Sequence, residues 1–224
     1  MRVKIEGGWF DEDGHAYYSD SGQRIPSLTQ ILRLSGLTDY DGIDPDVLEN
    51  AARRGTEVHV LAATYNQYGA LDPAWITEEC APYFDAYRRF LDESGFVPNP
   101  NWTERSFIAT IHGWRVGMTP DCHGTWKRDQ AIIEFKCTAA SHSSWAIQTA
   151  AQEAGIFKSN HCGRIRRYAL QLRKDATYRL FEHTKHDEDM DVMIAALRLV
   201  WWRLNDGQKL WNKLEAFEDA SVNA

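Results

Sequence analysis

Apolar side chains recur every three or four positions in five stretches of this 224-residue chain, which is the spacing of helices with one buried face. The five predicted helices span about residues 26–36, 45–68, 77–94, 143–157 and 187–211. Ser27 is a favoured N-cap for the first helix, and Gly36 ends it. The buried face of the last helix is predicted to comprise Met193, Ala196, Leu197, Val200, Trp201 and Leu204.

Between these helices the pattern is typical of strands. Three strands are predicted at about 101–111, 113–121 and 130–137, with turns at His112-Gly113 and at 123–129, as an antiparallel meander. Two more, at 164–173 and 177–184, are joined at Lys174-Asp175. The first 25 residues are polar and rich in turn residues, with Trp9, Phe10, Tyr17 and Tyr18 able to pack as short strands.

Helices followed by a sheet, a crossing helix and further strands predict an α/β sandwich. We expect one domain over 1–224, because this length supports a single hydrophobic core. Within it we expect a mostly helical part to about 95 that carries His59, a sheet core over about 96–186, and a C-terminal helix over about 187–213.

Composition narrows the class of protein. Apolar content of 43% and charged content of 25% are ordinary for a globular protein, and no run of about 18 apolar residues predicts a membrane helix. The start lacks the apolar stretch of a signal peptide, so we expect a cytoplasmic protein without a membrane partner. The four cysteines form no C-x-x-C pair, so we expect reduced thiols and no zinc site or iron–sulfur cluster.

The strongest chemical signal is a pair of carboxylates and a lysine around the third predicted strand. Asp121 follows Thr119-Pro120, and thirteen residues later Glu134-Phe135-Lys136 ends an apolar run. Alternate residues of a strand share a face, so Glu134 and Lys136 would point the same way. Carboxylates hold divalent cations that polarise a phosphate and lower the pKa of a bound water, and a lysine can orient that water. The pattern is typical of a metal-dependent phosphodiesterase.

Four motifs follow in order: Gly55-x-x-x-His59, Asp121, Glu134-x-Lys136, and Gln148 on the next helix. In this order the chain resembles the PD-(D/E)xK nuclease superfamily, nearest to the RecB-like exonuclease branch that includes the mitochondrial genome-maintenance exonuclease. Segments 25–32, 54–59 and 167–172 resemble small phage-encoded members, and the resemblance covers about residues 9–202. It implies a restriction-endonuclease-like core, with a central mixed β-sheet flanked by helices and an N-terminal helical extension.

The resemblance also implies a metal site. Asp121 and Glu134 would be the carboxylate ligands, the Phe135 backbone carbonyl a further oxygen ligand, and His59 a nitrogen ligand, with Lys136 as the catalytic lysine. Two carboxylates this close repel, so each tends to hold its proton unless a cation lies between them. The expected cofactor is Mg²⁺ or Mn²⁺, as one or two ions, and an imidazole nitrogen suits Mn²⁺ better.

Three further side chains have less specific roles. Gln148 would contact Lys136 or DNA. Gln152 shares its helix face, but it stands where related members often show the tyrosine of Gln-x-x-x-Tyr. Glu104 occupies a position where related nucleases often have an acidic residue on the preceding strand, so it is a candidate second-shell or outer metal ligand. A solvated strand edge is the alternative for Glu104.

Polar and cationic side chains elsewhere are candidate DNA contacts, because guanidinium groups bind phosphates in a bidentate geometry. The candidates are Arg53, Arg54, Thr56, Lys127, Arg128, Gln152, Arg164 and Arg166. The alternative for Arg53 and Arg54 is ion pairing with Glu49 or Glu57, and for Lys127, Arg128, Arg164 and Arg166 it is a solvated loop. A net charge of −7 argues weakly against a protein that coats nucleic acid, although bound cations supply positive charge at the scissile phosphate.

We therefore predict a Mg²⁺- or Mn²⁺-dependent deoxyribonuclease, and an exonuclease acting on DNA ends in particular. A structure-specific or nicking endonuclease, and a non-catalytic DNA- or partner-binding module of the same fold, are the alternatives. The residues leave open the polarity, the preference for single or double strands, DNA against RNA, and the pathway. They also leave open a homo-oligomer and a single-strand-binding or recombination partner. A phage-encoded protein would work in the cytoplasm of its bacterial host.

Overall fold

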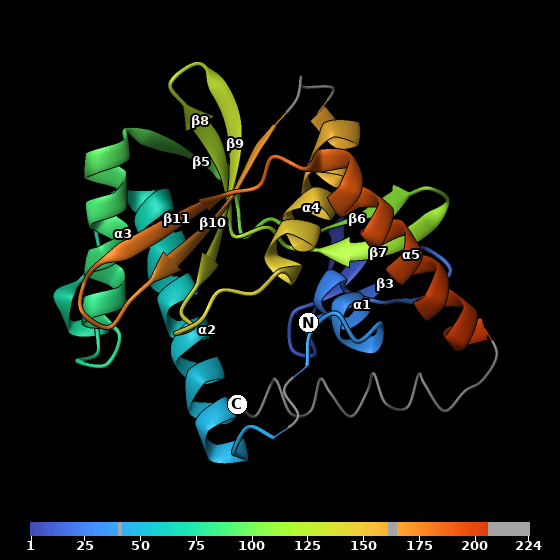
Figure 1. Ribbon diagram of the computed structural model, residues 1–224, viewed down its shortest axis with the longest axis horizontal. Helices are drawn as coiled ribbons and strands as arrows, with labels where there is room; N and C mark the ends of the chain where they lie inside the picture. The colour runs from blue at the N-terminus through green and yellow to red at the C-terminus, as the bar shows by residue number, and fades with distance from the viewer. Residues whose placement is uncertain (40–41, 161–164, 206–224) are drawn as a thin grey trace.

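A mixed five-stranded sheet lies at the centre of the computed structural model, which describes residues 1–39, 42–160 and 165–205 (Figure 1). The strand order is β11-β10-β9-β8-β5. Only β9 and β10 run parallel, and α4 crosses between them. The strands are β5 (Phe96–Thr103), β8 (Cys122–Trp126), β9 (Asp129–Lys136), β10 (Arg166–Leu172) and β11 (Tyr178–Glu182).

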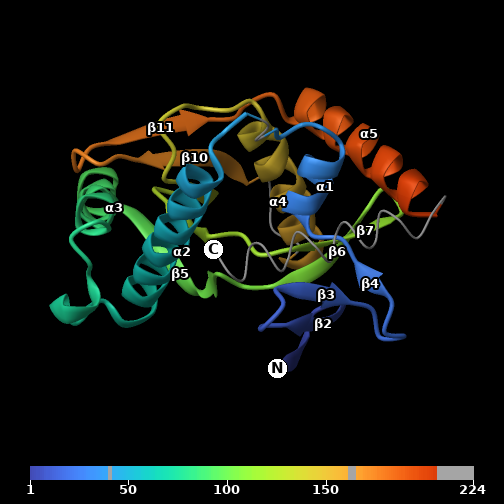
Figure 2. The same ribbon diagram turned by 90° about the horizontal axis from the view of Figure 1, so that it is seen from below.

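Helices cover both faces of this sheet, and each face has its own apolar cluster (Figures 1 and 2). Helices α2 (Pro45–Tyr68) and α3 (Ala81–Ser94) pack against Ile133 and Phe135 of β9. Helices α4 (Ser144–Asn160) and α5 (His186–Asn205) pack on the opposite side, where Ile132 points. The alternation of β9 thus matches its two covered faces. The predicted α/β architecture, with a central mixed sheet flanked by helices, is confirmed.

Two smaller sheets extend the α4 side. The N-terminal segment forms a four-stranded antiparallel sheet of β1 (Arg2–Ile5), β2 (Gly8–Asp11), β3 (Ala16–Tyr18) and β4 (Arg24–Ile25). Strands β6 (Phe107–Ile111) and β7 (Trp114–Met118) form a separate hairpin. The short helix α1 (Leu28–Leu34) follows β4, and a 3₁₀ turn, Pro73–Trp75, joins α2 to α3. Among the described helices, none has both the length and the apolar character that crossing a bilayer requires.

Local sequence signals account for the ends of the first helices. Ser27 caps α1 in a reciprocal capping box with Gln30, as its N-cap prediction requires. Asp44 caps α2, whose first residue is Pro45, and Gly69 ends this helix in the left-handed conformation. Helix α2 therefore spans the predicted residues. Helix α3 begins at Ala81 rather than near 77, because residues 77–80 form a turn.

The predicted meander is wrong in two places. The single strand expected at 101–111 is broken after Thr103, and its two parts, β5 and β6, belong to different sheets. The turn expected at 123–129 is mostly strand β8, and only Lys127 and Arg128 form the turn to β9. Position 124 of β8 requires a glycine because the β5 backbone at Pro98 passes too close to leave room for a side chain.

Other differences lie at the two ends of the chain. The part to residue 95 begins with a four-stranded sheet, so its helical character holds only from α1 onward. The last helix is described to Asn205, and the rest of its predicted range, 206–213, lies outside the described residues. Cys162 also lies outside them, whereas Cys80 and Cys122 are buried thiols and Cys137 is half-buried.

Candidate active site

Three potential metal ligands from distant parts of the chain meet beside the end of β9. His59 lies in the middle of α2, Glu104 follows β5, and Asp121 immediately precedes β8. The His59 Nδ1 atom is 3.3 Å from Asp121 Oδ1 and 3.6 Å from Glu104 Oε1. The ligand atoms of the three residues all lie within 4.8 Å of one another. The predicted meeting of His59 with Asp121 is therefore present, and Glu104 joins them.

The backbone positions Asp121 and Glu104 against the sheet. The Phe135 N–H donates to Asp121 Oδ2 at 2.6 Å, which holds the carboxylate beside β9. The Glu104 N–H donates to the Asp121 carbonyl at 3.2 Å. Glu104 adopts a φ of +48°, an uncommon conformation for a residue with a side chain. The break between β5 and β6 thus occurs at the residue that the cluster uses, as strained residues at functional sites often do.

A second group, made by side chains of β9 and α4, surrounds Glu134. Lys136 Nζ is 3.0 Å from Glu134 Oε1 and 2.9 Å from Gln148 Oε1. Gln148 Nε2 also donates to Glu134 Oε1, and Gln152 Nε2 donates to Glu134 Oε2 at 2.7 Å. Both oxygens of this buried carboxylate therefore accept hydrogen bonds. Alternation along β9 places Glu134 and Lys136 on the face that α4 covers, as predicted.

Burial and neighbouring charge together shift the pKa values of these groups. Burial raises the pKa of Glu104 to about 7; the imidazole of His59, 3.6 Å away, opposes this rise, and the charge of Asp121 adds to it. Burial and the charge of Asp121 likewise raise the pKa of Glu134. Burial lowers the pKa of His59, but the negative charges of Asp121 and Glu104 beside the ring outweigh it, so this pKa is well above its ordinary value. Negative charge has thus accumulated where a cation would relieve it.

The donor set suits a divalent cation. Two carboxylates and an imidazole are ligands that Mn²⁺ accepts readily and Mg²⁺ accepts less well. Glu104 Oε1 is buried without a hydrogen-bond partner among the described residues, which leaves an oxygen aimed at the cluster. Glu134 is not one of the three clustered ligands, because its oxygens face Lys136, Gln148 and Gln152. Ligation by Glu134 and by the Phe135 carbonyl remains a prediction.

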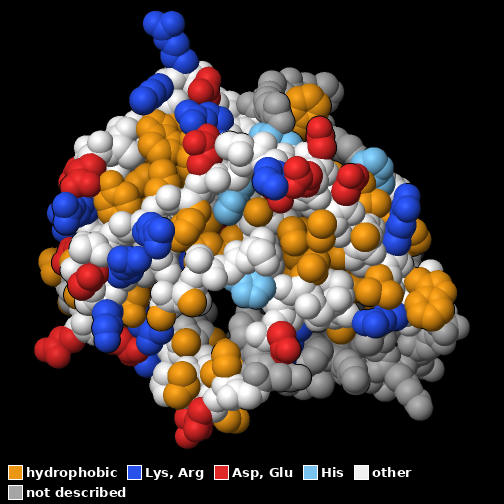
Figure 3. Space-filling model, viewed as in Figure 1, with side chains coloured by type: hydrophobic (Ala, Val, Ile, Leu, Met, Phe, Trp, Pro, Cys, Tyr) orange, Lys and Arg blue, Asp and Glu red, His pale blue; other side chains and the backbone are white. Residues whose placement is uncertain are grey.

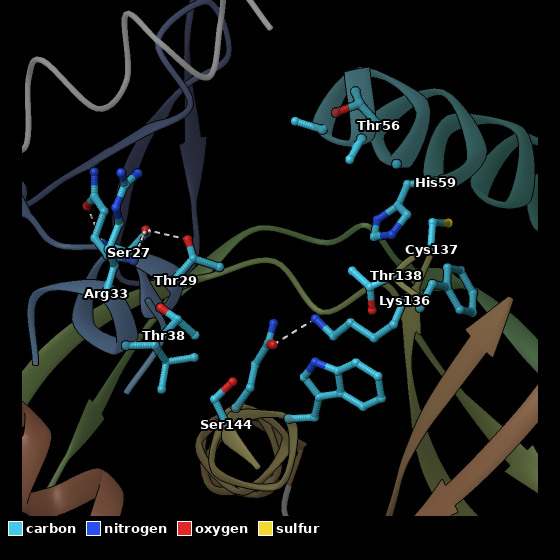
Figure 4. Close-up of a pocket in the computed structure, with 18 of the residues that line it drawn as sticks. Ser27, Thr29, Arg33, Thr38, Thr56, His59, Lys136, Cys137, Thr138 and Ser144 are labelled. Carbon is cyan, nitrogen blue, oxygen red and sulfur yellow. Dashed lines mark hydrogen bonds between the residues drawn. The ribbon is translucent and has the colours of Figure 1, made fainter. Parts of the chain in front are cut away.

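A cleft of about 520 Å³ opens beside these groups (Figure 4). Its walls come from α1, α2, the end of β9 and the start of α4, and His59, Lys136 and Gln148 line it. The wall from α2 consists of small side chains and His59, namely Ala51, Ala52, Gly55, Thr56 and His59. Figure 3 shows the face of the molecule hollowed near its centre, with a histidine at the edge of the hollow.

The structure distributes the predicted DNA contacts unevenly. Of the candidates within the described residues, only Thr56 lines the cleft. Gln152 is 1% exposed and bonds to Glu134, so its side chain supports the carboxylate rather than facing solvent. The α2 arginines point elsewhere, because Arg53 pairs with Glu57 and Glu79, and Arg54 pairs with Glu79. The alternative of ion pairing along α2 is thus present for Arg53.

The remaining described candidates lie at the other end of β9. Lys127 and Arg128 form the β8–β9 turn, nine and eight residues before Lys136, which corresponds to roughly 25–30 Å of extended strand. Arg166 pairs with Ala131 in the sheet register and bonds to Glu182 at 2.6 Å. Arg164 lies outside the described residues. None of these described arginine and lysine side chains lines the cleft.

Sequence reasoning missed the contribution of Trp145 and of several hydroxyl groups to the cleft wall. Trp145 stands at the start of α4, and its ring contacts Phe181 of β11 at a centroid distance of 5.6 Å. Ser144 and Thr138 also line the wall (Figure 4). Trp145 lies three residues before Gln148, so the helical repeat that placed Gln148 on the cleft side could have indicated it.

Comparisons with known proteins give weak similarity to exonucleases. The chain is similar to a candidate exonuclease from Eubacterium rectale, with 8% identity, 88% of this chain and 77% of that chain covered, and a TM-score of 0.41. It is also similar to an alkaline exonuclease from Laribacter hongkongensis, with 14% identity, 81% and 92% covered, and a TM-score of 0.38. No protein-family model matches the chain, and no curated protein matches it.

Proposed function

We propose that this chain is a divalent-metal-dependent deoxyribonuclease of the PD-(D/E)xK type, and that it is an exonuclease acting on DNA ends. The observation that carries the proposal is the contact of two groups at one end of β9. His59, Glu104 and Asp121 form a set of potential cation ligands, and beside them Lys136 bonds to the buried Glu134. The cleft gives a substrate access to Lys136.

Each residue of the site would have a distinct role. His59, Glu104 and Asp121 would hold the cation, with Glu134 and the Phe135 carbonyl as further candidate ligands. The cation would polarise the scissile phosphate and lower the pKa of the attacking water. Lys136 would orient that water through its ammonium donors and offset the charge that develops on the phosphate. Gln148 bonds to both Lys136 and Glu134, so it would keep the ammonium group in place during the reaction.

The test compares cleavage by the wild type, Lys136→Ala and a matched control, Lys185→Ala. Lys185 is an exposed lysine that pairs with Glu188 at the start of α5, far along the chain from β9. Linear DNA labelled at the 5′ or the 3′ end, single- and double-stranded, and a covalently closed circle are each incubated with Mg²⁺ or Mn²⁺. Circular dichroism and thermal melting check that all three proteins fold.

We expect the linear DNA to be lost in a metal-dependent way and the closed circle to remain intact. The cleavage rate should fall at least roughly a hundredfold in Lys136→Ala and stay at the wild-type value in Lys185→Ala. The labelled end that is released first would give the polarity. A cleaved circle would replace the exonuclease by an endonuclease. Cleavage that survives Lys136→Ala, or no cleavage with either metal, would refute the proposed active site.

A further inference from the structure

Three cations without ion-pair partners gather on the β10–β11 hairpin, which is not part of the cleft wall. Arg173 and Lys174 follow β10, and Arg179 lies in β11 opposite Gln171. Among the described residues, no carboxylate pairs with Arg173, Lys174 or Arg179 within 4.0 Å. Of the earlier candidates, Arg53, Arg54 and Arg166 pair with acids. No ion pair joins Lys127 or Arg128 to a described carboxylate either, but these two lie at the end of β9 opposite Lys136.

The hairpin turn follows the C-terminal end of β10, which lies beside the C-terminal end of β9 where Lys136 stands. In the parallel register of β9 and β10, Gln171 stands beside Lys136, and Arg173 comes two residues later. The Gln171 Nε2 group also donates to the carbonyls of Thr138 and Ala139, at 2.8 Å and 3.1 Å. Thr138 lines the cleft, so one side chain connects the root of the hairpin to the cleft wall.

A row of side chains makes a second connection on the α4 side. Trp145 lines the cleft, and its ring lies against Phe181. The guanidinium carbon of Arg179 lies 4.9 Å from the centre of the Phe181 ring. Arg179 is therefore separated from the cleft by only two aromatic side chains. One strand of a DNA duplex leaving the cleft in this direction would carry a phosphate roughly every 3.4 Å along the helix axis.

The local charge of this hairpin suits contact with DNA. The chain carries a net charge of −7, and a polyanion approaching it needs a local region of positive charge. The nearest carboxylate in sequence, Asp175, accepts from the Thr177 N–H at 3.1 Å and from the Thr177 hydroxyl at 2.6 Å. Its charge offsets one of the three cations, so residues 173–179 keep a net charge of +2. The cleft wall contributes only two cationic side chains, Arg33 and Lys136, among the described residues.

We propose that Arg173, Lys174 and Arg179 bind phosphates of the DNA strand that extends from the cleft, and that this hairpin is the main basic contact of the substrate outside the active site. The inference rests on the proposed nuclease function. It assigns the contact to a surface different from the β8–β9 turn and from α2, where the sequence had suggested candidates.

The test measures binding of labelled DNA by fluorescence anisotropy in buffer with EDTA, where a metal-dependent enzyme does not cleave. The variant Arg173→Gln/Lys174→Gln/Arg179→Gln is compared with Arg2→Gln/Lys185→Gln/Arg198→Gln. The control removes two arginines and one lysine from the N-terminal sheet, from α5 and from the residue before α5, so the change of net charge is the same. The double variant Lys174→Gln/Arg179→Gln leaves the half-buried Arg173 in place in case the triple variant does not fold. Titrations from 50 to 200 mM salt give the slope of log K against log salt.

We expect the hairpin variant to bind roughly tenfold or more weakly at 100 mM salt, with a salt slope reduced by about two to three. The double variant should show about two thirds of that reduction, and the control should keep the wild-type slope. In the cleavage assay, the hairpin variant should raise KM and keep kcat. Equal losses in the hairpin and control variants, or no loss in either, would overturn the inference. If the wild-type protein binds DNA through the hairpin but never cleaves it, the proposed nuclease function is refuted while the proposed binding surface is supported.

Discussion

Replacing Gln152 by leucine tests the buried network around Glu134 directly. The change keeps a side chain of similar size in α4 but removes the amide that donates to Glu134 Oε2 at 2.7 Å. Glu134 is 3% exposed, so solvent cannot readily replace the lost donor. A hydrogen bond to a charged group contributes about 1.5–3 kcal/mol, and a buried charge left with fewer donors costs a similar amount. For a chain of this length that corresponds to a fall in Tm of roughly 3–12 °C.

A double-mutant cycle separates the charge of Glu134 from packing. Gln152→Leu, Glu134→Gln and the double variant are unfolded in urea without metal near neutral pH. In the Glu134→Gln background, where the carboxylate is neutral, the leucine substitution should cost only about 0.5–1.5 kcal/mol. The reasoning fails if Gln152→Leu leaves the free energy of unfolding unchanged, or if its cost is the same in both backgrounds. Either result would mean that the amide does not stabilise a charged Glu134.

Three further predictions follow from other parts of the structure. Mn²⁺ at a hundred times its Kd should stabilise the wild type by about 2.7 kcal/mol, as measured by thermal melting. Asp121→Asn removes a charged ligand and should lose most of this stabilisation. Equal stabilisation of both proteins would place the cation elsewhere. Gly117→Ala should lower the free energy of unfolding in urea by roughly 1–3 kcal/mol, because its methyl group would overlap the buried ring of Tyr17, and an unchanged midpoint would contradict this packing. Burial and the charge of Arg167 lower the pKa of His183 to about 4, so the unfolded chain binds more protons than the folded one between pH 6.5 and 4. The contribution of neutral His183 to the free energy of unfolding is therefore fully present above pH 6.5, and it falls by roughly 1–3 kcal/mol as the pH drops towards 4. His183→Gln should flatten this part of the plot of stability against pH. An unchanged plot would contradict the assignment.

Local signals in the sequence were sufficient for α2, β9 and α4. The Asp44-Pro45 start and the Gly69 end of α2 are short-range features, so the helix that carries His59 could be placed from them. The alternation of β9 likewise placed Glu134 and Lys136 on one face, since side-chain direction in a strand depends only on its period of two. The spacing of Gln148 and Gln152 put both on one side of α4 for the corresponding reason.

Elements that depend on close approach of distant segments were misjudged. Gly124 resembles a turn residue in the sequence, whereas in the structure it allows the backbone of β5 to pass beside β8. The break at Glu104 had no strong signal, because glutamate rarely adopts a positive φ and nothing nearby in the sequence requires one. The roles expected for Gln152 and Arg53 as DNA contacts also depended on partners, Glu134 and Glu79, that lie far away in the sequence.

The sequence by itself determined which residues form α2, β9 and α4 and which of their side chains share a face, because hydrogen bonding and periodicity within one element are local. Only the tertiary structure decided that Glu104 joins His59 and Asp121, that both Glu134 oxygens are occupied by β9 and α4 donors, and that cations with no carboxylate partner among the described residues lie on the β10–β11 hairpin. Those arrangements depend on how the sheet and its helices pack across long sequence separations, where burial and charge pairing select the partners.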